Sequence, residues 1–389
     1  MSVILCLRPG RDRAAFLREA RAAGLVVKPL RGLPRHMMVE GMGPDAFPLA
    51  GHPAIETLEE GDTPARGETL QPISIAASME GGSWGIARHI RRDAPWLVAP
   101  RLRHPLNTSF RCARSGTGVD AYVIDTGIRY EHQEFGNRAS FVGGTYGAGG
   151  IDDQGHGTSV AGCLAGATVG IARGTALRIV KGLNSANSGT LANIATCIGI
   201  VRDDYLARAA TNRPAILNLS LSANGSTVAA AVADCIDAGI VVVASAANGM
   251  TDSVPIPGST ADVICVGGIK ANDTPYYTGA SGTNFGPRVD LLAASERVWT
   301  AAIGANDAYR IATGTSFGAP LTSGVIACML QGKVRLTTRT QVQAVRAAVM
   351  ANTTAGRFVP QPQFGIGDLP DRILWLDPDA LAEAIPGIP

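Results

Sequence analysis

The stretch Gly314-Thr315-Ser316-Phe317-Gly318-Ala319-Pro320 organises the rest of the chain. It runs into residues 321–329, whose mostly apolar sequence predicts a buried helix. A serine in the first turn of such a helix lies at the positive end of the helix dipole, beside N–H groups without a partner in the helix. The flanking glycines leave room for another backbone to approach. These features suit a nucleophilic hydroxyl, although an ordinary Thr-Ser helix cap is the commoner meaning of such a pattern.

The composition predicts a well-packed globular protein. Of the 389 residues, 46% are hydrophobic and 17% are charged, enough for one large domain and a smaller one. The formal net charge of +2 argues against a protein that holds nucleic acid or another polyanion. A local basic run lacks interleaved aromatic residues, so we predict a solvated face. It comprises Arg88, Arg91, Arg92, Arg101 and Arg103.

The cysteines predict neither a disulfide scaffold nor a zinc site. They are odd in number and form no Cys-x-x-Cys pair, so buried free thiols are the better interpretation. They are Cys6, Cys112, Cys163, Cys197, Cys235, Cys265 and Cys328. Residues 3–7 are too short for a signal-peptide core, and no apolar run has the length of a membrane span. We therefore expect an intracellular or virion-associated protein rather than a secreted one, and no membrane partner.

The first sixty residues predict a small α+β module. Strand-like and helix-like stretches follow one another in the order βαββαβ, which resembles a ferredoxin-like module. The strands are expected at 3–7, 25–29, 36–40 and 55–59, and the helices at 12–23 and 44–47. We assign the module to residues 1–60. Residues 61–83 are dominated by polar and small residues without a period, so we predict an exposed linker that contains a processing region.

Strands alternate with helices from residue 84 onward. This alternation implies right-handed crossovers and a doubly wound, mostly parallel sheet flanked by helices. The strands are expected at 119–124, 176–180, 215–221, 240–244, 263–266 and 289–292, and the helices at 159–167, 190–209, 228–238, 321–329 and 341–351. The fold class is therefore α/β, with this domain at 84–376. A tail at 377–389 has no assigned role.

The positions of the histidines restrict the chemistry. All six precede Ser316, whereas the Ser, acid, His order of an α/β-hydrolase needs a histidine after the nucleophile. The order that remains is Asp125, His156, Ser316. Each lies where a strand ends or a helix begins, which is where a parallel sheet gathers functional side chains.

Each of these residues has a physical role in an acyl transfer. His156 can take the proton of the Ser316 hydroxyl and return it to a leaving amine, because imidazole titrates near neutral pH. Asp125, at the end of a buried strand, would orient the imidazole and stabilise its charged form. Taken singly, His156 is more often a capping or core histidine, and Asp125 a turn residue. The three motifs together favour catalysis.

The stretches around these residues resemble the three catalytic signatures of the subtilisin-like serine proteases, the subtilases. They are residues 123–128 (VIDTGI), 155–162 (GHGTSVAG) and 314–320 (GTSFGAP). Residues 84–88 (WGIAR) are similar to the start of the mature domain in the proteinase K branch. The resemblance implies a subtilisin-like fold and a serine endopeptidase that acts on peptides or proteins.

The N-terminal module is similar in element order to subtilase propeptides. Such propeptides assist folding and inhibit the enzyme by laying their C-terminal tail in the active site. The resemblance therefore implies a zymogen that processes itself, with its own N-terminal module as an intramolecular inhibitor.

The resemblance also implies an oxyanion donor and two substrate-binding segments. Asn248 would donate its side-chain amide to the oxyanion, with the Ser316 N–H as the second donor; in isolation it would be a turn residue before glycine. The substrate-binding residues would be Leu219, Ser220, Leu221 and Ser222 in one segment and Ser245, Ala246 and Ala247 in the other. The first segment would act as an edge strand that pairs with extended substrate.

Two positions depart from the family in a way that affects specificity. Ser222 and Ala247 stand where the family has glycine in the walls of the primary specificity pocket. Because a packed pocket does not relax easily, the added volume predicts a preference for a small or modest residue before the scissile bond.

The chemistry requires no cofactor, but a structural calcium site is one interpretation of the sequence. By resemblance to proteinase K, it would use Asp290 with the carbonyls of Ala261 and Val263. A hard cation needs several oxygen ligands and the sequence shows one carboxylate, so a solvated or capped Asp290 is equally open.

Two alternatives to a protease stay open at this point. One is a catalytically silent subtilase fold that serves in binding or assembly. The other is an esterase that uses the same triad.

Overall fold

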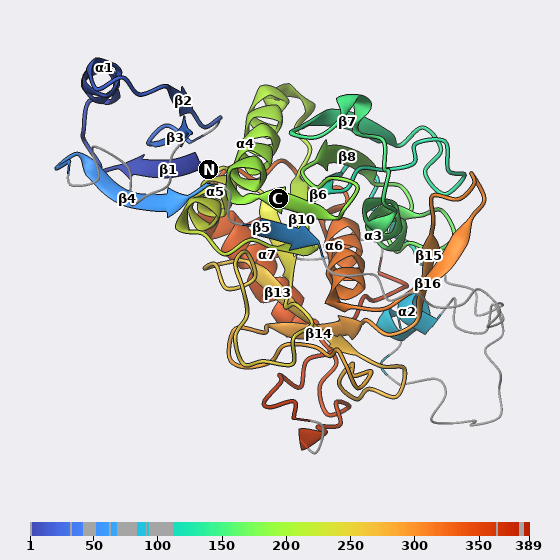
Figure 1. Cartoon of the computed structure of the whole chain (residues 1–389). Coiled ribbons are helices and arrows are strands. Elements are labelled where there is room, and N and C mark those ends of the chain that lie inside the picture. The colour runs from blue at the N-terminus through green and yellow to red at the C-terminus, as the bar shows by residue number, and fades with distance from the viewer. Residues whose placement is uncertain are drawn as a thin grey trace.

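The computed structural model describes residues 2–31, 33–41, 52–61, 64–67, 84–90, 92, 112–362, 365–380 and 385–389. Figure 1 shows the N-terminal module (blue) beside a larger domain that contains the central sheet. The helix predicted at 44–47 and most of the linker predicted at 61–83 lie outside the described residues.

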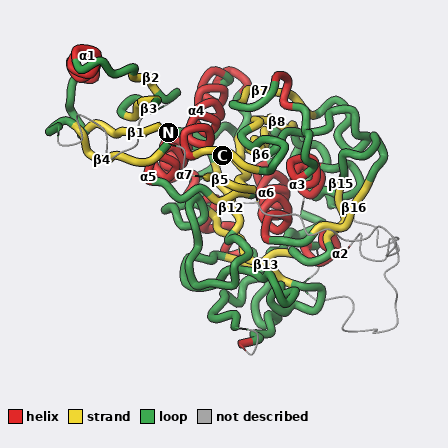
Figure 2. The backbone as a smooth tube through the Cα atoms, in the orientation of Figure 1, coloured by secondary structure: helices red, strands yellow, loops and turns green. Residues whose placement is uncertain are grey.

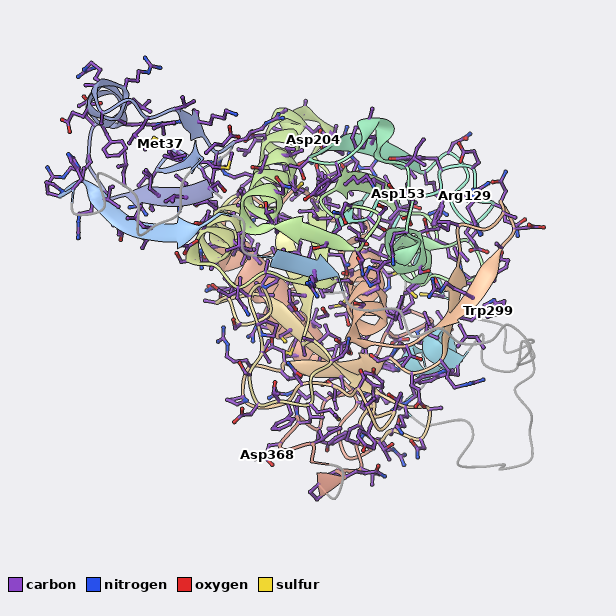
Figure 3. All side chains as sticks on the ribbon, viewed as in Figure 1. Met37, Arg129, Asp153, Asp204, Trp299 and Asp368 are labelled. Atoms are coloured by element: carbon purple, nitrogen blue, oxygen red, sulfur yellow. The ribbon has the colours of Figure 1, made fainter. Side chains whose placement is uncertain are left out.

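The N-terminal module is an antiparallel sheet with a helix on one face. The strand order is β2-β3-β1-β4. Its elements are β1 (Ser2–Leu7), α1 (Arg13–Ala22), β2 (Val27–Pro29), β3 (His36–Glu40) and β4 (Ile55–Glu60). Asp12 caps α1 by accepting the Ala14 N–H at 2.8 Å. Phe16 of α1 packs with Met37 (labelled in Figure 3) in a small core of the module's own.

The larger domain is built on a seven-stranded parallel sheet, which confirms the predicted fold class. The strand order is β14-β13-β12-β10-β6-β8-β7. The strands are β6 (Asp120–Asp125), β7 (Ala139–Gly144), β8 (Ala176–Lys181), β10 (Ala215–Leu219), β12 (Val241–Ser245), β13 (Ile264–Ile269) and β14 (Leu291–Ala294). The middle strands are buried along their length because helices cover both faces. In this sheet only β7 has no predicted counterpart; it is a partly exposed edge strand that ends in Gly143-Gly144.

The helices form a layer on each face of the sheet (Figures 1 and 2). On one face α3 packs against α6, and on the other α4 packs against α5, which contacts α7. Their bounds are α2 (Trp84–His89), α3 (His156–Ala165), α4 (Leu191–Ala207), α5 (Ser226–Asp237), α6 (Thr315–Leu330) and α7 (Arg339–Ala351), with short 3₁₀ turns η3 (Ala148–Gly150) and η4 (Ala209–Thr211). Every residue of α6 is buried, so this helix runs through the core.

Two small sheets complete the domain. One is the hairpin of β15 (Val298–Ala301) and β16 (Tyr309–Ala312). The other places β5 (Pro64–Gly67) between β11 (Leu221–Ser222) and β9 (Ser188–Thr190), and Figure 1 shows β5 within the larger domain rather than beside the N-terminal module. These four residues form a strand where the sequence predicted a linker, and the prediction of exposure is wrong at Ala65, which is fully buried.

The predicted solvated face is also wrong at Arg88. This side chain is buried, and its Nε and Nη2 donate to the two carboxylate oxygens of Asp273 at 2.7 and 3.0 Å. A buried charge needs such a partner. Arg92 stacks over the Trp375 ring at 3.7 Å, whereas Arg91 and residues 101 and 103 lie outside the described part of the chain.

The cysteines are free thiols, as the sequence predicted. All seven cysteines are free; six are buried and Cys112 is partly buried. The tail packs Ile385 and Ile388 into the core. Within the described ranges, no helix is both long and apolar enough to cross a bilayer.

Candidate active site

Asp125 and His156 are brought together at the carboxyl edge of the parallel sheet. Asp125 is the last residue of β6, and His156 is the first residue of α3. The imidazole Nδ1 lies 2.9 Å from each carboxylate oxygen of Asp125, and both side chains are buried. A carboxylate accepts hydrogen bonds only, so Nδ1 carries the proton in this pair and Nε2 is the basic nitrogen.

A buried polar network holds the loop that precedes His156. Asp152 accepts hydrogen bonds from the Gly155 N–H at 2.7 Å and from the Thr158 hydroxyl at 2.6 Å. The Thr126 hydroxyl donates to Asp152 at 2.8 Å, which links this loop to the residue after Asp125. A Cβ at Gly157 would lie 2.2 Å from a backbone oxygen of the β6 loop, so the close approach of the two loops requires glycine there.

Ser316 is the second residue of α6, and its neighbour along the chain contacts the imidazole. The ring of the next residue, Phe317, packs against the His156 ring with centroids 5.8 Å apart. Pro320 has no N–H, so the carbonyl of Ser316 has no partner four residues along the helix. That carbonyl instead accepts the Ser220 hydroxyl at 2.8 Å, which fixes the start of α6 to the predicted substrate-binding segment.

Asn248 follows β12 and contacts the start of α6. Its Oδ1 accepts the Thr315 N–H at 2.9 Å and lies 3.2 Å from the Thr315 hydroxyl. Because Oδ1 is engaged as an acceptor, the amide Nδ2 is the atom of this side chain that can donate.

The segment 219–222 forms the end of β10 and the short edge strand β11, as predicted. The Ser316 hydroxyl donates to the carbonyl of Ser220 at 3.4 Å, so this strand begins beside Ser316. Strand β5 occupies the pairing edge: Arg66 lies opposite Ser222, and Gly67 opposite Leu221. The chain of β5 therefore runs toward Ser316.

The second predicted segment is only partly accessible. Ser245 and Ala246 are buried, so their side chains are part of the core rather than of an open surface. Ala247 is partly buried and has a φ of 73°, a left-handed backbone that costs free energy for any residue other than glycine.

The predicted calcium ligands do not fit a calcium site. The Asp290 carboxylate accepts the Cys265 N–H at 2.9 Å and forms an ion pair with Arg346. A guanidinium on the carboxylate takes the place of a cation and repels a second one, and Ala261 and Val263 add no further carboxylate. Among the described residues, no group of three or more His, Cys, Asp or Glu side chains could hold a metal ion.

One residue that the sequence did not reveal anchors the N-terminal module. Glu59 lies at the start of α5, where Gly225 provides no side-chain cap. Its Oε1 accepts the Ser226 N–H at 2.6 Å, and its Oε2 accepts the Thr227 N–H at 3.1 Å and the Thr227 hydroxyl at 2.7 Å. Burial favours the neutral acid, but these hydrogen bonds outweigh it and lower the pKa of Glu59.

An ion pair also joins the module to the larger domain. Arg31 Nε lies 3.0 Å from an Asp203 carboxylate oxygen on α4. Neither this pair nor the Glu59 cap has a local sequence signal, because each joins residues more than 160 positions apart.

The chain is similar to known proteins over the larger domain. The model of the subtilase family (Peptidase_S8) matches residues 116–367. Subtilisin-like protease 1 of Pseudogymnoascus destructans is 33% identical over 279 residues, which cover 70% of this chain and 67% of that protein. Proteinase T of Parengyodontium album is 34% identical over 268 residues, or 66% of this chain and 83% of that protein.

The fold agrees with a solved structure. The crystal structure of a cold adapted subtilisin-like serine proteinase aligns with a TM-score of 0.64 and 25% identity. The alignment covers 76% of this chain and 98% of that structure.

Proposed function

The chain belongs to the subtilase family of serine endopeptidases, and from this premise we propose that Asp125, His156 and Ser316 form its catalytic triad. We further propose that Asn248 is the oxyanion donor and that the chain is made as a self-inhibited precursor. The observation that carries the catalytic proposal is the buried Asp125–His156 hydrogen bond next to the start of α6.

The triad would act by proton transfer through His156. As the Ser316 Oγ attacks the scissile carbonyl, Nε2 takes the hydroxyl proton and Asp125 stabilises the imidazolium. The same proton then goes to the leaving amine, which leaves an acyl group on Ser316. A water molecule that loses a proton to Nε2 hydrolyses this acyl-enzyme and releases the new carboxylate.

The oxyanion formed at each step needs donors that are already in position. Asn248 is held by its hydrogen bond from Thr315, so its Nδ2 can donate without a reorientation of the amide. The Ser316 N–H, at the positive end of α6, would be the second donor.

The pairing of β5 supports a self-inhibited precursor. An extended substrate would add a strand along β11, and β5 occupies that position between β11 and β9. Its direction places Pro64–Gly67 on the acyl side of the scissile bond. We therefore expect self-cleavage within the residues that follow Gly67.

The module would stay bound after this cleavage. Glu59 caps α5 and Arg31 pairs with α4, so the contacts do not depend on an intact chain. The cleaved module would then inhibit as a product until it dissociates or is degraded.

A fluorophosphonate probe and N-terminal sequencing test these proposals together. The wild type should react with the probe and acquire a new terminus after Gly67, whereas Ser316→Ala should do neither. Ser323→Ala is a matched control, because it removes another buried hydroxyl from α6. It should keep both properties.

The two alternatives predict other outcomes. A silent binding protein would leave the wild type unlabelled and uncut. An esterase would label and hydrolyse esters but leave extended peptides intact.

A further inference from the structure

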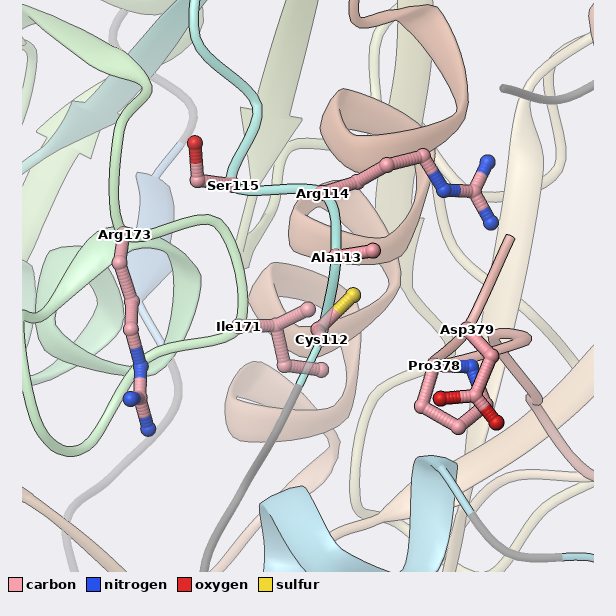
Figure 4. A pocket seen from close by; sticks show the side chains of 8 residues that line it. All are labelled: Cys112, Ala113, Arg114, Ser115, Ile171, Arg173, Pro378 and Asp379. Carbon is pink, nitrogen blue, oxygen red and sulfur yellow. The ribbon is translucent and has the colours of Figure 1, made fainter. Parts of the chain in front are cut away.

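A cavity of about 400 Å³ lies away from the active site, against the C-terminal half of α6. Its walls come from residues 112–115, from a loop that contains Arg173, and from Pro378 and Asp379 (Figure 4). Cys328 of α6 is twelve residues along the helix from Ser316, which corresponds to about 18 Å.

Two thiols meet at this cavity. Cys112 lines it and is partly exposed, whereas Cys328 is buried behind it. The Cys328 S–H donates at 3.5 Å to the carbonyl of Arg114, two residues along the chain from Cys112, and Cys112 packs against the core cluster that contains Cys328. The pair therefore has one sulfur that small molecules can reach and one that they cannot.

The backbone on the C-terminal side of Cys112 is fixed to α6 and to the tail. The N–H groups of Ser115 and Gly116 both donate to the Gln331 side chain, at 2.7 and 2.9 Å. The Ala113 N–H donates to the Pro378 carbonyl at 2.7 Å. These bonds hold the chain at Cys112 against the C-terminal end of α6.

The surroundings of Cys112 favour its thiolate. The neighbouring Cys328 thiol lowers the pKa of the Cys112 thiol, and the charges of Arg114 and Arg173 lower it further, against the opposing effect of burial. Figure 4 shows Cys112 with these two arginine side chains on either side. A thiolate in a positive, accessible environment is the form that reacts with peroxides.

We propose that Cys112 and Cys328 form an oxidative modification site for hydrogen peroxide that closes to a disulfide. The Cys112 thiolate attacks one peroxide oxygen, the O–O bond breaks, and hydroxide leaves; the sulfur is oxidised to sulfenic acid and the peroxide is reduced. The Cys328 sulfur then attacks the sulfenic sulfur, the S–O bond breaks, and the hydroxyl leaves as water with the Cys328 proton. In sum, two thiols and one peroxide give one disulfide and two waters.

The disulfide would stabilise the domain. It links the segment before β6 to the helix that carries Ser316 and encloses all seven strands of the parallel sheet in one covalent loop. A loop of this length removes much of the unfolded chain's conformational freedom. We expect the melting temperature to rise by about 5 °C, and reduction with dithiothreitol to reverse the rise.

The test uses the full chain with Ser316→Ala, so that self-cleavage does not intervene. The protein is treated with a small excess of hydrogen peroxide, unfolded in N-ethylmaleimide, and mapped by peptide mass spectrometry. The expected result is a peptide of residue 112 linked to a peptide of residue 328, with the other five cysteines alkylated. Cys112→Ser should abolish this link and the rise in melting temperature, whereas Cys6→Ser in the N-terminal module should preserve both.

Three outcomes would overturn the proposal. They are seven alkylated thiols after peroxide treatment, Cys112 recovered as sulfinic acid without a linked peptide, and a linked protein that melts no higher than the reduced one. The mapping of the parent chain decides the first two, even if Cys112→Ser does not fold.

Discussion

At the residue scale, the proposed role of Asn248 is to stabilise the transition state rather than to bind the substrate. Its Oδ1 is committed to Thr315, so truncation removes both a structural acceptor and the proposed oxyanion donor. For Asn248→Ala we expect kcat to fall by about 100- to 1000-fold with little change in KM, a range known from subtilisin itself. Steady-state kinetics on one peptide substrate measure the split. A rise in KM at constant kcat would assign Asn248 to substrate binding instead.

The backbone of Ala247 has a strained conformation that glycine would relieve. Its φ of 73° is unfavourable for alanine, whereas glycine adopts it without strain. For Ala247→Gly we expect a gain of about 0.5–1 kcal/mol in the free energy of unfolding, measured by denaturant titration in the Ser316→Ala chain. We also expect a relative gain of about tenfold in kcat/KM for substrates with a larger residue before the scissile bond, because the pocket wall recedes.

The neighbouring alanine provides the control for this substitution. Ala246 is buried and has no positive φ, so Ala246→Gly should lower stability. If Ala247→Gly destabilised the protein to the same extent, backbone strain at this position would be ruled out.

Single residues were predictable where a short motif carries the chemistry. The pairing of Asp125 with His156 follows from strand ends and helix starts that meet at one edge of a parallel sheet. The bond from Ser220 to the carbonyl of Ser316 was not predictable, because it depends on Pro320 within a helix and on a strand almost a hundred residues away. The ion pair of Asp290 with Arg346 was likewise not predictable, because it also joins residues far apart in the sequence.

At the scale of secondary-structure elements, α5 depends on a cap from another part of the chain. Because its hydrogen bonds hold the pKa of Glu59 below the ordinary value of 4.5, they stabilise the docked module above that pH. The stabilisation is lost as the pH falls through the lowered pKa. We therefore expect the self-cleaved module to stay bound at neutral pH and to dissociate as the pH falls below 4.5, as measured by gel filtration.

Glu59→Gln tests whether this carboxylate is the titrating group. At neutral pH the variant should bind its module roughly tenfold or more weakly, because hydrogen bonds to a charged group contribute about 1.5–3 kcal/mol. Its residual affinity should depend little on pH. Glu56→Gln is a matched control, since Glu56 pairs with Arg35 inside the module and should leave docking unchanged. Equal effects of the two substitutions would contradict a specific helix cap.

Elements were predictable where hydrophobic periodicity is local. Most predicted strands of the parallel sheet occur within two residues of their expected bounds, because continuous apolar runs suit strands that are buried on both faces. Strand β5 was not predictable, since Pro64–Gly67 has the composition of a linker and becomes a strand only between β9 and β11. Its conformation is therefore determined by tertiary contacts.

At the scale of the whole molecule, Arg346 joins α7 to the start of β14 through Asp290. Subtilases often bind structural calcium, and in this chain the carboxylate that the sequence suggested for calcium is neutralised by a guanidinium. Burial raises the pKa of Asp290, and the charges of Arg346 and Arg288 oppose that rise. The negative charge of the Asp290 carboxylate is therefore balanced by arginine side chains.

We therefore expect thermal stability that does not depend on calcium. A calcium ion present at a hundred times its dissociation constant would add about 2.7 kcal/mol, so its removal would lower the melting temperature by several degrees. Chelation with EDTA should leave the melting temperature of the Ser316→Ala chain unchanged, whereas Arg346→Ala should cost about 2 kcal/mol because it leaves a largely buried carboxylate unpaired. Arg288→Ala, which removes a more distant charge that also contacts the Ser259 carbonyl, should cost less. A marked fall in melting temperature with EDTA would contradict this expectation.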